Sequence, residues 1–298
     1  MRIALATSAN LPDLIPDETP LREAFAQLGV EAPPAVWSDP GVDWASFDAV
    51  LIRTTWDYTT RLAEFLAWAE RVEAVTPLLN PARVLRWNTH KRYLHDLASL
   101  GVRTLPMDIL PRGTPIDLAR AMRERGWGRA VLKPAVGATA RRQERVSLGS
   151  EPGFLSAGAG QRHLDAALAD EDMLLQPFAE SVASEGEVSL MVVDGECTHA
   201  VRKRAKPGDY RVQTDWGGTV ERAVATEGEI AETERVLVAI AALGIAAEPL
   251  AYARVDLVGW QGEPALIELE VAEPQMFLLP CPDAGARLAE VAVRRARR

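Results

Sequence analysis

The sequence predicts a protein of mixed α/β and α+β class that is divided into three units. In the first third, short apolar runs alternate with amphipathic helical patterns, which indicates βαβ units on a parallel sheet. The middle third mixes short strands with helices. The last third contains two strand pairs joined by turn residues, which favours antiparallel hairpins. We place the three units at residues 1–103, 104–179 and 180–298.

Composition and charge exclude several classes of protein. The chain has 298 residues, of which 48% are hydrophobic and 25% charged, as in ordinary globular proteins. Its net charge of −9 disfavours nucleic acid as a partner, because neutralising phosphates requires a basic face. Cys197 and Cys281 lie far apart, which indicates neither a disulfide scaffold nor a zinc site. With no signal peptide and no run of 18 apolar residues, we expect a cytoplasmic protein without a membrane partner.

In the first unit, two apolar runs of strand length, at residues 2–7 and 48–55, flank a helical segment. Thr19 is the expected N-cap of that helix and Gly29 its expected stop. A second amphipathic helix is predicted over residues 61–75.

The other two units follow from the same kind of pattern. Asp194-Gly195 is a strong turn signal between two strands of the last unit. The predicted central elements are helix 116–126, strand 129–136, helix 161–169 and strand 172–178. The predicted C-terminal elements are strands 187–193 and 197–203, helix 229–243, strands 252–258 and 265–270, and a terminal helix.

The second C-terminal hairpin carries the most informative charges. Arg254 and Asp256 share a face of one strand, and Glu268 and Glu270 share a face of the next. With the turn centred on Gly262, Asp256 lies opposite Glu268, and Arg254 lies opposite Glu270. Like charges this close destabilise a sheet unless a hard cation such as Mg²⁺ neutralises them. The alternative is a solvated polar face on which Arg254 bridges the acids, and the spacing alone does not decide.

Basic residues near predicted loops favour an anionic ligand. Lys91 and Lys133 lie at element boundaries, and residues 136–140 have no bulky side chain, so their N–H groups could approach a phosphate. A basic run from Arg202 to Arg211 on an acidic chain also favours a small anion. The alternatives are a snorkelling lysine at a strand exit and an exposed charged loop.

A polar and aromatic segment, which we name the 53–58 block, follows the second predicted strand. Loops at the carboxyl ends of parallel strands form the ligand crevice of α/β proteins. The block could therefore recognise a zwitterionic amino acid, and the alternative is a helix N-cap with a packed tryptophan. Its residues are Arg53, Thr54, Thr55, Trp56, Asp57 and Tyr58.

Other common chemistries have no motif here. The sequence contains no Walker-type phosphate loop, no Gly-x-Gly-x-x-Gly after the first strand and no Gly-x-Ser-x-Gly elbow. Its four histidines form no His-Glu-x-x-His motif, so we expect them to be structural or exposed.

Taken in order along almost the whole chain, these features resemble the ATP-grasp superfamily, near glutathione synthetase and the bacterial amino-acid ligases. The resemblance implies an ATP-grasp fold with an N-terminal substrate-binding α/β unit, a small central lid and a C-terminal antiparallel-sheet unit with the metal site. It also implies ATP and Mg²⁺ as cofactors, with Mn²⁺ as an alternative metal. One departure is visible, because the last metal position is often Asn in this superfamily and is Glu270 here.

The resemblance implies a role for each matching residue. The phosphates of ATP would contact Lys91, Lys133 and the loop Gly137, Ala138 and Thr139. Adenine would bind the backbone at Gln176, Pro177 and Phe178, and the ribose would bind Glu180 or Glu187. The metal would be held by Asp256, Glu268 and Glu270, and the transferred phosphoryl group would be stabilised by Arg211 and Arg254.

A narrower resemblance concerns the reaction. The 53–58 block and residues 268–274 are similar to the cyclising ligases of D-cycloserine biosynthesis, which act on O-ureido-D-serine. This implies a small amino-acid-like substrate whose carboxylate is activated as an acyl phosphate and captured by the substrate's own nitrogen. The alternatives are an intermolecular amino-acid or peptide ligase and a nucleotide-binding regulatory protein without turnover. Assembly into a homo-oligomer stays open.

Overall fold

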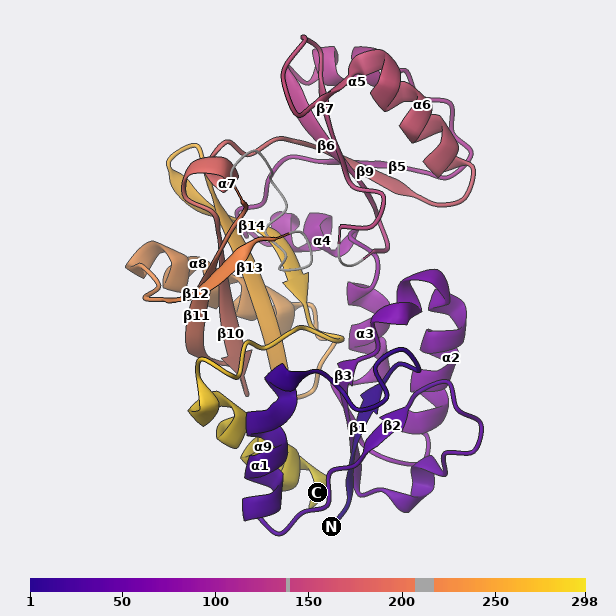
Figure 1. The fold of residues 1–298 in the computed structure, drawn as a ribbon, viewed down its shortest axis with the longest axis vertical. Helices are drawn as coiled ribbons and strands as arrows, with labels where there is room; N and C mark the ends of the chain where they lie inside the picture. Colours follow the sequence, from indigo (N-terminus) through magenta and orange to yellow (C-terminus); the bar gives the residue numbers. More distant parts are fainter. Residues whose placement is uncertain (138–139, 207–216) are drawn as a thin grey trace.

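The structure, a computed structural model, describes residues 1–137, 140–206 and 217–298, and its strands form three separate sheets (Figure 1). One sheet is parallel, one is mixed and one is antiparallel, so the mixed α/β and α+β class predicted from the sequence is confirmed. Within the described residues, none of the helices has the length and apolar character needed to cross a bilayer.

The N-terminal sheet is parallel and has the strand order β2-β1-β3-β4. Its elements are β1 (Ile3–Thr7), η1 (Pro16–Glu18), α1 (Thr19–Gln27), β2 (Pro34–Val36), η2 (Trp44–Ser46), β3 (Ala49–Thr54), η3 (Trp56–Thr60), α2 (Leu62–Glu73) and β4 (Leu78–Leu79). Successive side chains of β1 face opposite sides of the sheet. Ile3 and Leu5 pack with α1 and the C-terminal helix α9 (Pro282–Ala296), whereas Ala4 and Ala6 pack with α2.

Helix α1 begins directly after the 3₁₀ turn η1, so Glu18 is its N-cap, and the prediction of Thr19 as N-cap is wrong by one residue. Gly29 follows the helix with φ +66°, which agrees with its prediction as the helix stop. Helices α1 and α9 cross closely at Gly285, where a Cβ atom would lie 3.0 Å from the backbone nitrogen of Leu21. The C-terminal helix therefore belongs to the core of the N-terminal sheet.

The central sheet has the order β5-β9-β6-β7-β8, and its helices α5 and α6 lie together on one side of it (Figure 1). The elements are β5 (Asp108–Leu110), α5 (Leu118–Glu124), β6 (Arg129–Pro134), β7 (Glu144–Ser147), β8 (Leu155–Ser156), α6 (Ala157–Leu168) and β9 (Met173–Pro177). All buried members of its hydrophobic cluster lie between Leu110 and Leu175, so this unit has a core of its own. The short strands β7 and β8 lie between residues 136 and 161, where the sequence analysis assigned no helix or strand.

The C-terminal sheet is antiparallel and has the order β12-β11-β10-β13-β14. Its elements are α7 (Ser181–Ser184), β10 (Glu187–Val193), β11 (Glu196–Arg204), β12 (Thr219–Ala223), α8 (Glu227–Ala242), β13 (Tyr252–Trp260) and β14 (Glu263–Glu270). The turn Asp194-Gly195 joins β10 and β11 with φ values of +54° and +81°, so the predicted first hairpin is confirmed.

Two helices that the sequence analysis did not assign connect the units. They are α3 (Ala82–Asn88) and α4 (Tyr93–Ser99). Tyr93, Leu94 and Leu97 of α4 are buried in the same cluster as Val236 and Ile240 of α8. The region before the central unit is thus packed against the C-terminal sheet.

A buried ion pair joins η1 to the end of β3. Arg53 Nη2 donates to Glu18 Oε1 at 2.7 Å, and both side chains are at most 1% exposed. We predict that Glu18→Gln lowers the free energy of unfolding by about 3–5 kcal/mol, because it leaves a buried guanidinium without its counter-charge. Urea unfolding at neutral pH measures this effect.

Glu124→Gln is the matched control, because Glu124 pairs with Arg120 on the exposed face of α5 at a similar distance, 2.7 Å. It should cost less than about 1 kcal/mol. Equal losses in the two variants would contradict the prediction.

Candidate active site

The β13–β14 hairpin sets the geometry of the site. Its turn residues, Gln261 and Gly262, have φ values of +53° and +86°, so the turn is centred between them and not on Gly262 as expected. A β-bulge at Ile267 adds one residue to β14, and Asp256 consequently lies opposite Glu268. Without this bulge, Glu268 would point to the other face of the sheet. The predicted pairing is therefore confirmed, although a bulge produces it rather than the turn.

Three carboxylates gather on this face. Oxygens of Asp256, Glu268 and Glu270 all lie within 4.8 Å of one another. Asp256 is 1% exposed, and the other two are partly buried. A set of carboxylate oxygens suits a hard divalent cation such as Mg²⁺ or Mn²⁺. The donor set thus fits the metal that the resemblance implied.

Two basic side chains of the same sheet neutralise part of this charge. Arg254 lies opposite Glu270, donates to Asp256 Oδ2 at 2.9 Å and contacts Glu270 Oε1 at 2.5 Å. Lys203, at the end of β11, lies 3.4 Å from Asp256 Oδ1 and forms an ion pair with Glu187. Glu187, one of the two candidate ribose ligands, is thereby tied to the acid cluster.

Two lysines from outside the sheet act on Glu268, Lys91 by direct contact and Lys133 through its charge. Lys91 Nζ lies 2.7 Å from Glu268 Oε1 and donates to the carbonyl of Gly137 at 3.1 Å. The backbone of Lys91 is held in turn by the carbonyl of Ala135, at 2.8 Å. Burial lowers the pKa of Lys133, on β6, to about 8, although Glu268 acts in the opposite direction. Both lysines named from the sequence therefore lie by the acid cluster.

The three acids titrate differently because their neighbours differ. Although burial raises the pKa of Asp256, Arg254 and Lys203 hold that pKa well below its usual value. The pKa of Glu268 is also lowered, since Lys91 and Lys133 outweigh its burial. Burial raises the pKa of Glu270 to about 7, Arg254 opposes this, and the charges of Glu268 and Asp256 add to it.

The predicted adenine segment forms the end of β9 and the residues after it. Gln176 and Pro177 pair with β6, and Gln176 is 2% exposed. The N–H of Phe178 donates to the carbonyl of Arg129 at 3.1 Å. Glu180 is mostly exposed and forms an ion pair with Arg129 at 2.6 Å. This segment connects the central sheet to the C-terminal sheet.

The charged residues of the 53–58 block have protein partners. Arg53 is fully buried by its pair with Glu18, and its Nη2 also donates to the carbonyl of Pro274 at 3.2 Å. Asp57 accepts hydrogen bonds from Trp37 and Arg61, at 2.7 and 3.4 Å. The hydroxyl of Thr54 bonds to Thr7 on β1 at 2.5 Å, and that of Thr55 is buried without a partner in the described residues.

The aromatic residues of the block reach the segment after β14. Trp56 Nε1 donates to the backbone carbonyl of Glu273 at 3.0 Å, and the Tyr58 hydroxyl bonds to the Glu273 carboxylate. Burial, then the charge of Glu270, raises the pKa of Glu273 to about 8. The charges of Glu270 and Glu268 also act on the pKa of Tyr58, so the block borders the acid cluster through its tyrosine.

Three of the proposed ligand-binding residues, Ala138, Thr139 and Arg211, lie outside the described residues. The sequence analysis in turn assigned no individual role to Lys203, Ser189 or Glu273. Ser189 lies opposite Asp256 and donates a hydrogen bond to it. Ser189 could have been recognised as a polar residue in the apolar strand 187–193. Lys203 could have been recognised as part of the basic run from Arg202 to Arg211.

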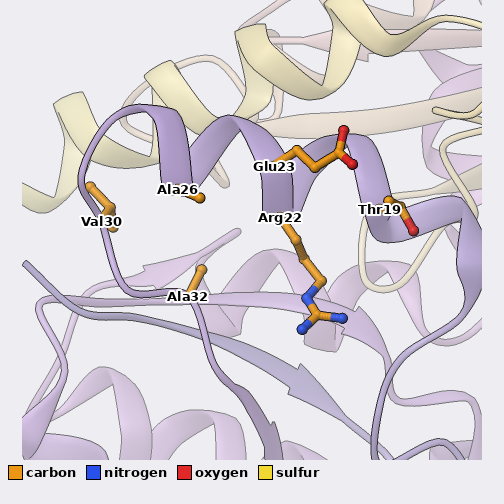
Figure 2. A pocket seen from close by; sticks show the side chains of 6 residues that line it. All are labelled: Thr19, Arg22, Glu23, Ala26, Val30 and Ala32. Carbon is orange, nitrogen blue, oxygen red and sulfur yellow. The ribbon is translucent and has the colours of Figure 1, made fainter.

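A separate pocket of about 390 Å³ lies beside α1 in the N-terminal unit, where Arg22 extends from the helix into the space below it (Figure 2). Its lining contains none of the residues of the acid cluster. The lining residues are Thr19, Arg22, Glu23, Ala26, Val30 and Ala32.

Comparison with known proteins shows the family to which the chain belongs. Residues 3–80 match the model of the N-terminal domain of D-cycloserine synthetase DcsG, and residues 157–277 match the RimK-like ATP-grasp domain. The chain is 34% identical to the cycloserine biosynthesis protein DcsG of Streptomyces lavendulae, over 98% of both chains. The protein belongs to the ATP-grasp family that includes DcsG. It is an ATP-grasp ligase, and such ligases use ATP together with a divalent metal.

Further similarities support the ATP-grasp assignment. The crystal structure of DcsG superposes with a TM-score of 0.87 and covers 99% of this chain and 100% of its own. A D-alanine–D-alanine ligase from Bacillus anthracis, 16% identical, shares the fold with a TM-score of 0.71 over 100% of this chain and 97% of its own. A glutathione synthetase from Parasynechococcus marenigrum is 28% identical over 86% of this chain and 70% of its own length.

Metal binding should depend on pH through Glu270. A carboxyl group must lose its proton to bind a cation, and the pKa of Glu270 is about 7. The affinity for Mn²⁺ should therefore rise as pH increases from about 6 to about 8, with proton release near pH 7. Titration calorimetry in buffers of different ionisation enthalpy counts the released protons.

Glu270→Asn is the control variant, because the amide keeps an oxygen ligand without a titrating proton. Its proton release should fall and its affinity should depend less on pH. Unchanged proton release in this variant would contradict the assignment.

Gly186 shapes the approach of β10 to β11. It has φ +84°, and a Cβ atom there would lie 2.3 Å from the carbonyl oxygen of Lys203. Gly186→Ala should therefore displace the Lys203–Glu187 pair and destabilise the protein by about 2–4 kcal/mol, combining backbone strain with steric overlap.

Gly262→Ala is matched in backbone conformation, with φ +86°, but has no atom within 4 Å of the new Cβ. It should cost only about 1–2 kcal/mol. Urea unfolding compares the two variants, and equal losses would show that the close approach to Lys203 has no effect.

Proposed function

We propose that this ATP-grasp ligase converts O-ureido-D-serine into D-cycloserine by intramolecular ring closure. The observation that supports this most is the likeness to DcsG over 98% of both chains, together with the match of residues 3–80 to its N-terminal domain. The acid cluster with its two lysines has the composition that ATP-dependent activation of a carboxylate requires.

In this proposal, each unit contributes part of the nucleotide site. The lysines Lys91 and Lys133 bind the phosphates of ATP, the loop of Gly137, Ala138 and Thr139 closes over them, and the central unit acts as a lid. The backbone of residues 176–178 holds adenine, and Glu180 or Glu187 holds the ribose. The separate core of the central unit supports a lid that moves as one body.

The metal would be Mg²⁺, bound by Asp256, Glu268 and Glu270. When bound, it neutralises charge on the transferring phosphoryl group. Arg254, and in this proposal Arg211, stabilise the acyl phosphate from the protein side, and Arg254 is held in place by its contacts with Asp256 and Glu270.

Ring closure depends on the position of the substrate. The 53–58 block and the segment after β14 would hold it in a folded shape, so that the oxygen-bound ureido nitrogen attacks the activated carboxyl group and expels phosphate. Hydrolysis of the carbamoyl group left on that nitrogen, to CO2 and ammonia, then gives D-cycloserine. An intramolecular nucleophile gains a large effective molarity from such positioning. The closed lid would exclude water, which otherwise hydrolyses the acyl phosphate.

Mass spectrometry of the products tests the reaction. Purified protein with Mg-ATP and O-ureido-D-serine should form D-cycloserine together with ADP. ADP formation only after addition of a second amino acid would favour an intermolecular ligase. Binding of ATP without any product would contradict the cyclisation.

Two substitutions test the assignment of the site. Lys133→Ala and Glu268→Ala should each lower kcat at least about 100-fold, because Lys133 would neutralise the transferring group directly and Glu268 would hold the metal that does so. Arg120→Ala, on the exposed face of α5, is the control and should leave kcat unchanged. Melting temperatures establish that the variants fold, and turnover near the wild-type rate in either site variant would refute the assignment.

A further inference from the structure

Glu273 lies on a segment whose backbone is fixed by side chains from several elements. Each carbonyl from residue 271 to residue 277 accepts a hydrogen bond from a side chain. The donors, in order, are Asn80, Tyr252, Trp56, Arg53, Arg254 and His199, which serves the last two carbonyls. The position of the Glu273 side chain is therefore set by the fold of two units.

Among the described residues, the carboxyl group of Glu273 is buried without a direct ion pair. The residue is 4% exposed, and its side chain bonds to the hydroxyl of Tyr58. Within the described residues, no basic group forms an ion pair with it. Arg254 and Lys91 attract it only from a distance, since they are paired with Glu270 and Glu268.

An ionised carboxylate is costly to bury without a counter-charge, so burial favours the protonated form of Glu273. Burial and the charge of Glu270 raise the pKa of Glu273 to about 8, although Tyr58 opposes this. At neutral pH the side chain is therefore largely protonated when no ligand is bound, and a cation bound beside it would favour the ionised carboxylate. A single carboxylate with an aromatic hydroxyl suits an ammonium group better than a divalent metal, which takes several oxygen ligands.

Arg254 links the segment of Glu273 to the acid cluster, because its Nη1 donates to the carbonyl of Gln275 at 3.3 Å while its Nη2 contacts Glu270 at 2.5 Å. This location fits the geometry of an α-amino acid. Its ammonium group is two bonds from its carboxyl carbon, so a group that binds the ammonium must lie beside the place where the carboxylate is activated. Glu273 follows Glu270 by three residues, and each charge acts on the pKa of a neighbour in the site.

We infer that the Glu273 carboxylate, held by the Tyr58 hydroxyl, binds the α-ammonium group of the amino-acid substrate. This inference rests on the proposed function, because it takes the acid cluster as the place of carboxylate activation. It makes Glu273 a specificity-determining residue: Glu273 selects amino acids over simple carboxylic acids.

The test compares matched substrates with and without the amine. Capture of the acyl phosphate by hydroxylamine gives kcat/KM for O-ureido-D-serine and for 3-(ureidooxy)propanoate, which lacks only the amine, and likewise for D-alanine and propanoate. The wild type should prefer the amine-bearing member of a pair about 100-fold or more. Glu273→Gln should reduce this preference to less than about tenfold, mainly by raising KM for the amino acid and not for ATP.

Two further variants separate binding from folding. Glu273→Asp keeps the charge and should retain most of the preference, and Tyr58→Phe removes only the hydroxyl and should lower it by an intermediate factor. An unchanged preference in Glu273→Gln, or a wild type that activates both members of each pair equally, would overturn the inference. Preference for D-alanine over propanoate without D-cycloserine formation would support the ammonium site while refuting the proposed cyclisation.

Discussion

The arrangement of this site depends on the mutual repulsion of three carboxylates held within 4.8 Å of one another. Such a cluster cannot carry its full charge at low exposure unless cations surround it. Arg254 and Lys203 supply charge from the sheet itself, and Lys91 supplies it from the segment before the central unit. Ion pairs with these acids therefore bring separate parts of the chain together at the site.

Nearby cations compensate the three acids to different degrees, and the pKa values of the acids differ as a result. Asp256 contacts both Arg254 and Lys203, which lower its pKa, whereas the pKa of Glu270 is raised to about 7. The pKa of Lys133 is lowered to about 8 by its burial, so this lysine would gain stabilisation from an anion such as a phosphate. A cation beside the acids and an anion beside Lys133 would each be stabilised by this arrangement.

The segment from residue 271 to residue 277 joins the N-terminal unit to this site. It has no regular secondary structure, yet each of its carbonyls is bonded to a side chain, which explains why so much of the 53–58 block is buried. Arg53 acts there as a structural clamp between Glu18 and the carbonyl of Pro274. Tyr58 and Glu273 lie at the edge of this clamp, and both are buried.

The sequence by itself determined the class of fold and the identity of the acids. Strand and helix periodicities are local, and Asp194-Gly195 defines its hairpin through two residues with positive φ. Only the tertiary structure decided the bulge at Ile267, the short strands β7 and β8, and the partners of Lys203 and Glu273. Strands this short carry too few residues for a pattern, and an ion pair between distant residues depends on how whole sheets pack. For these reasons the sequence identified the acids in advance. It did not identify all of the basic residues around them or the hydrogen bonds that fix residues 271–277.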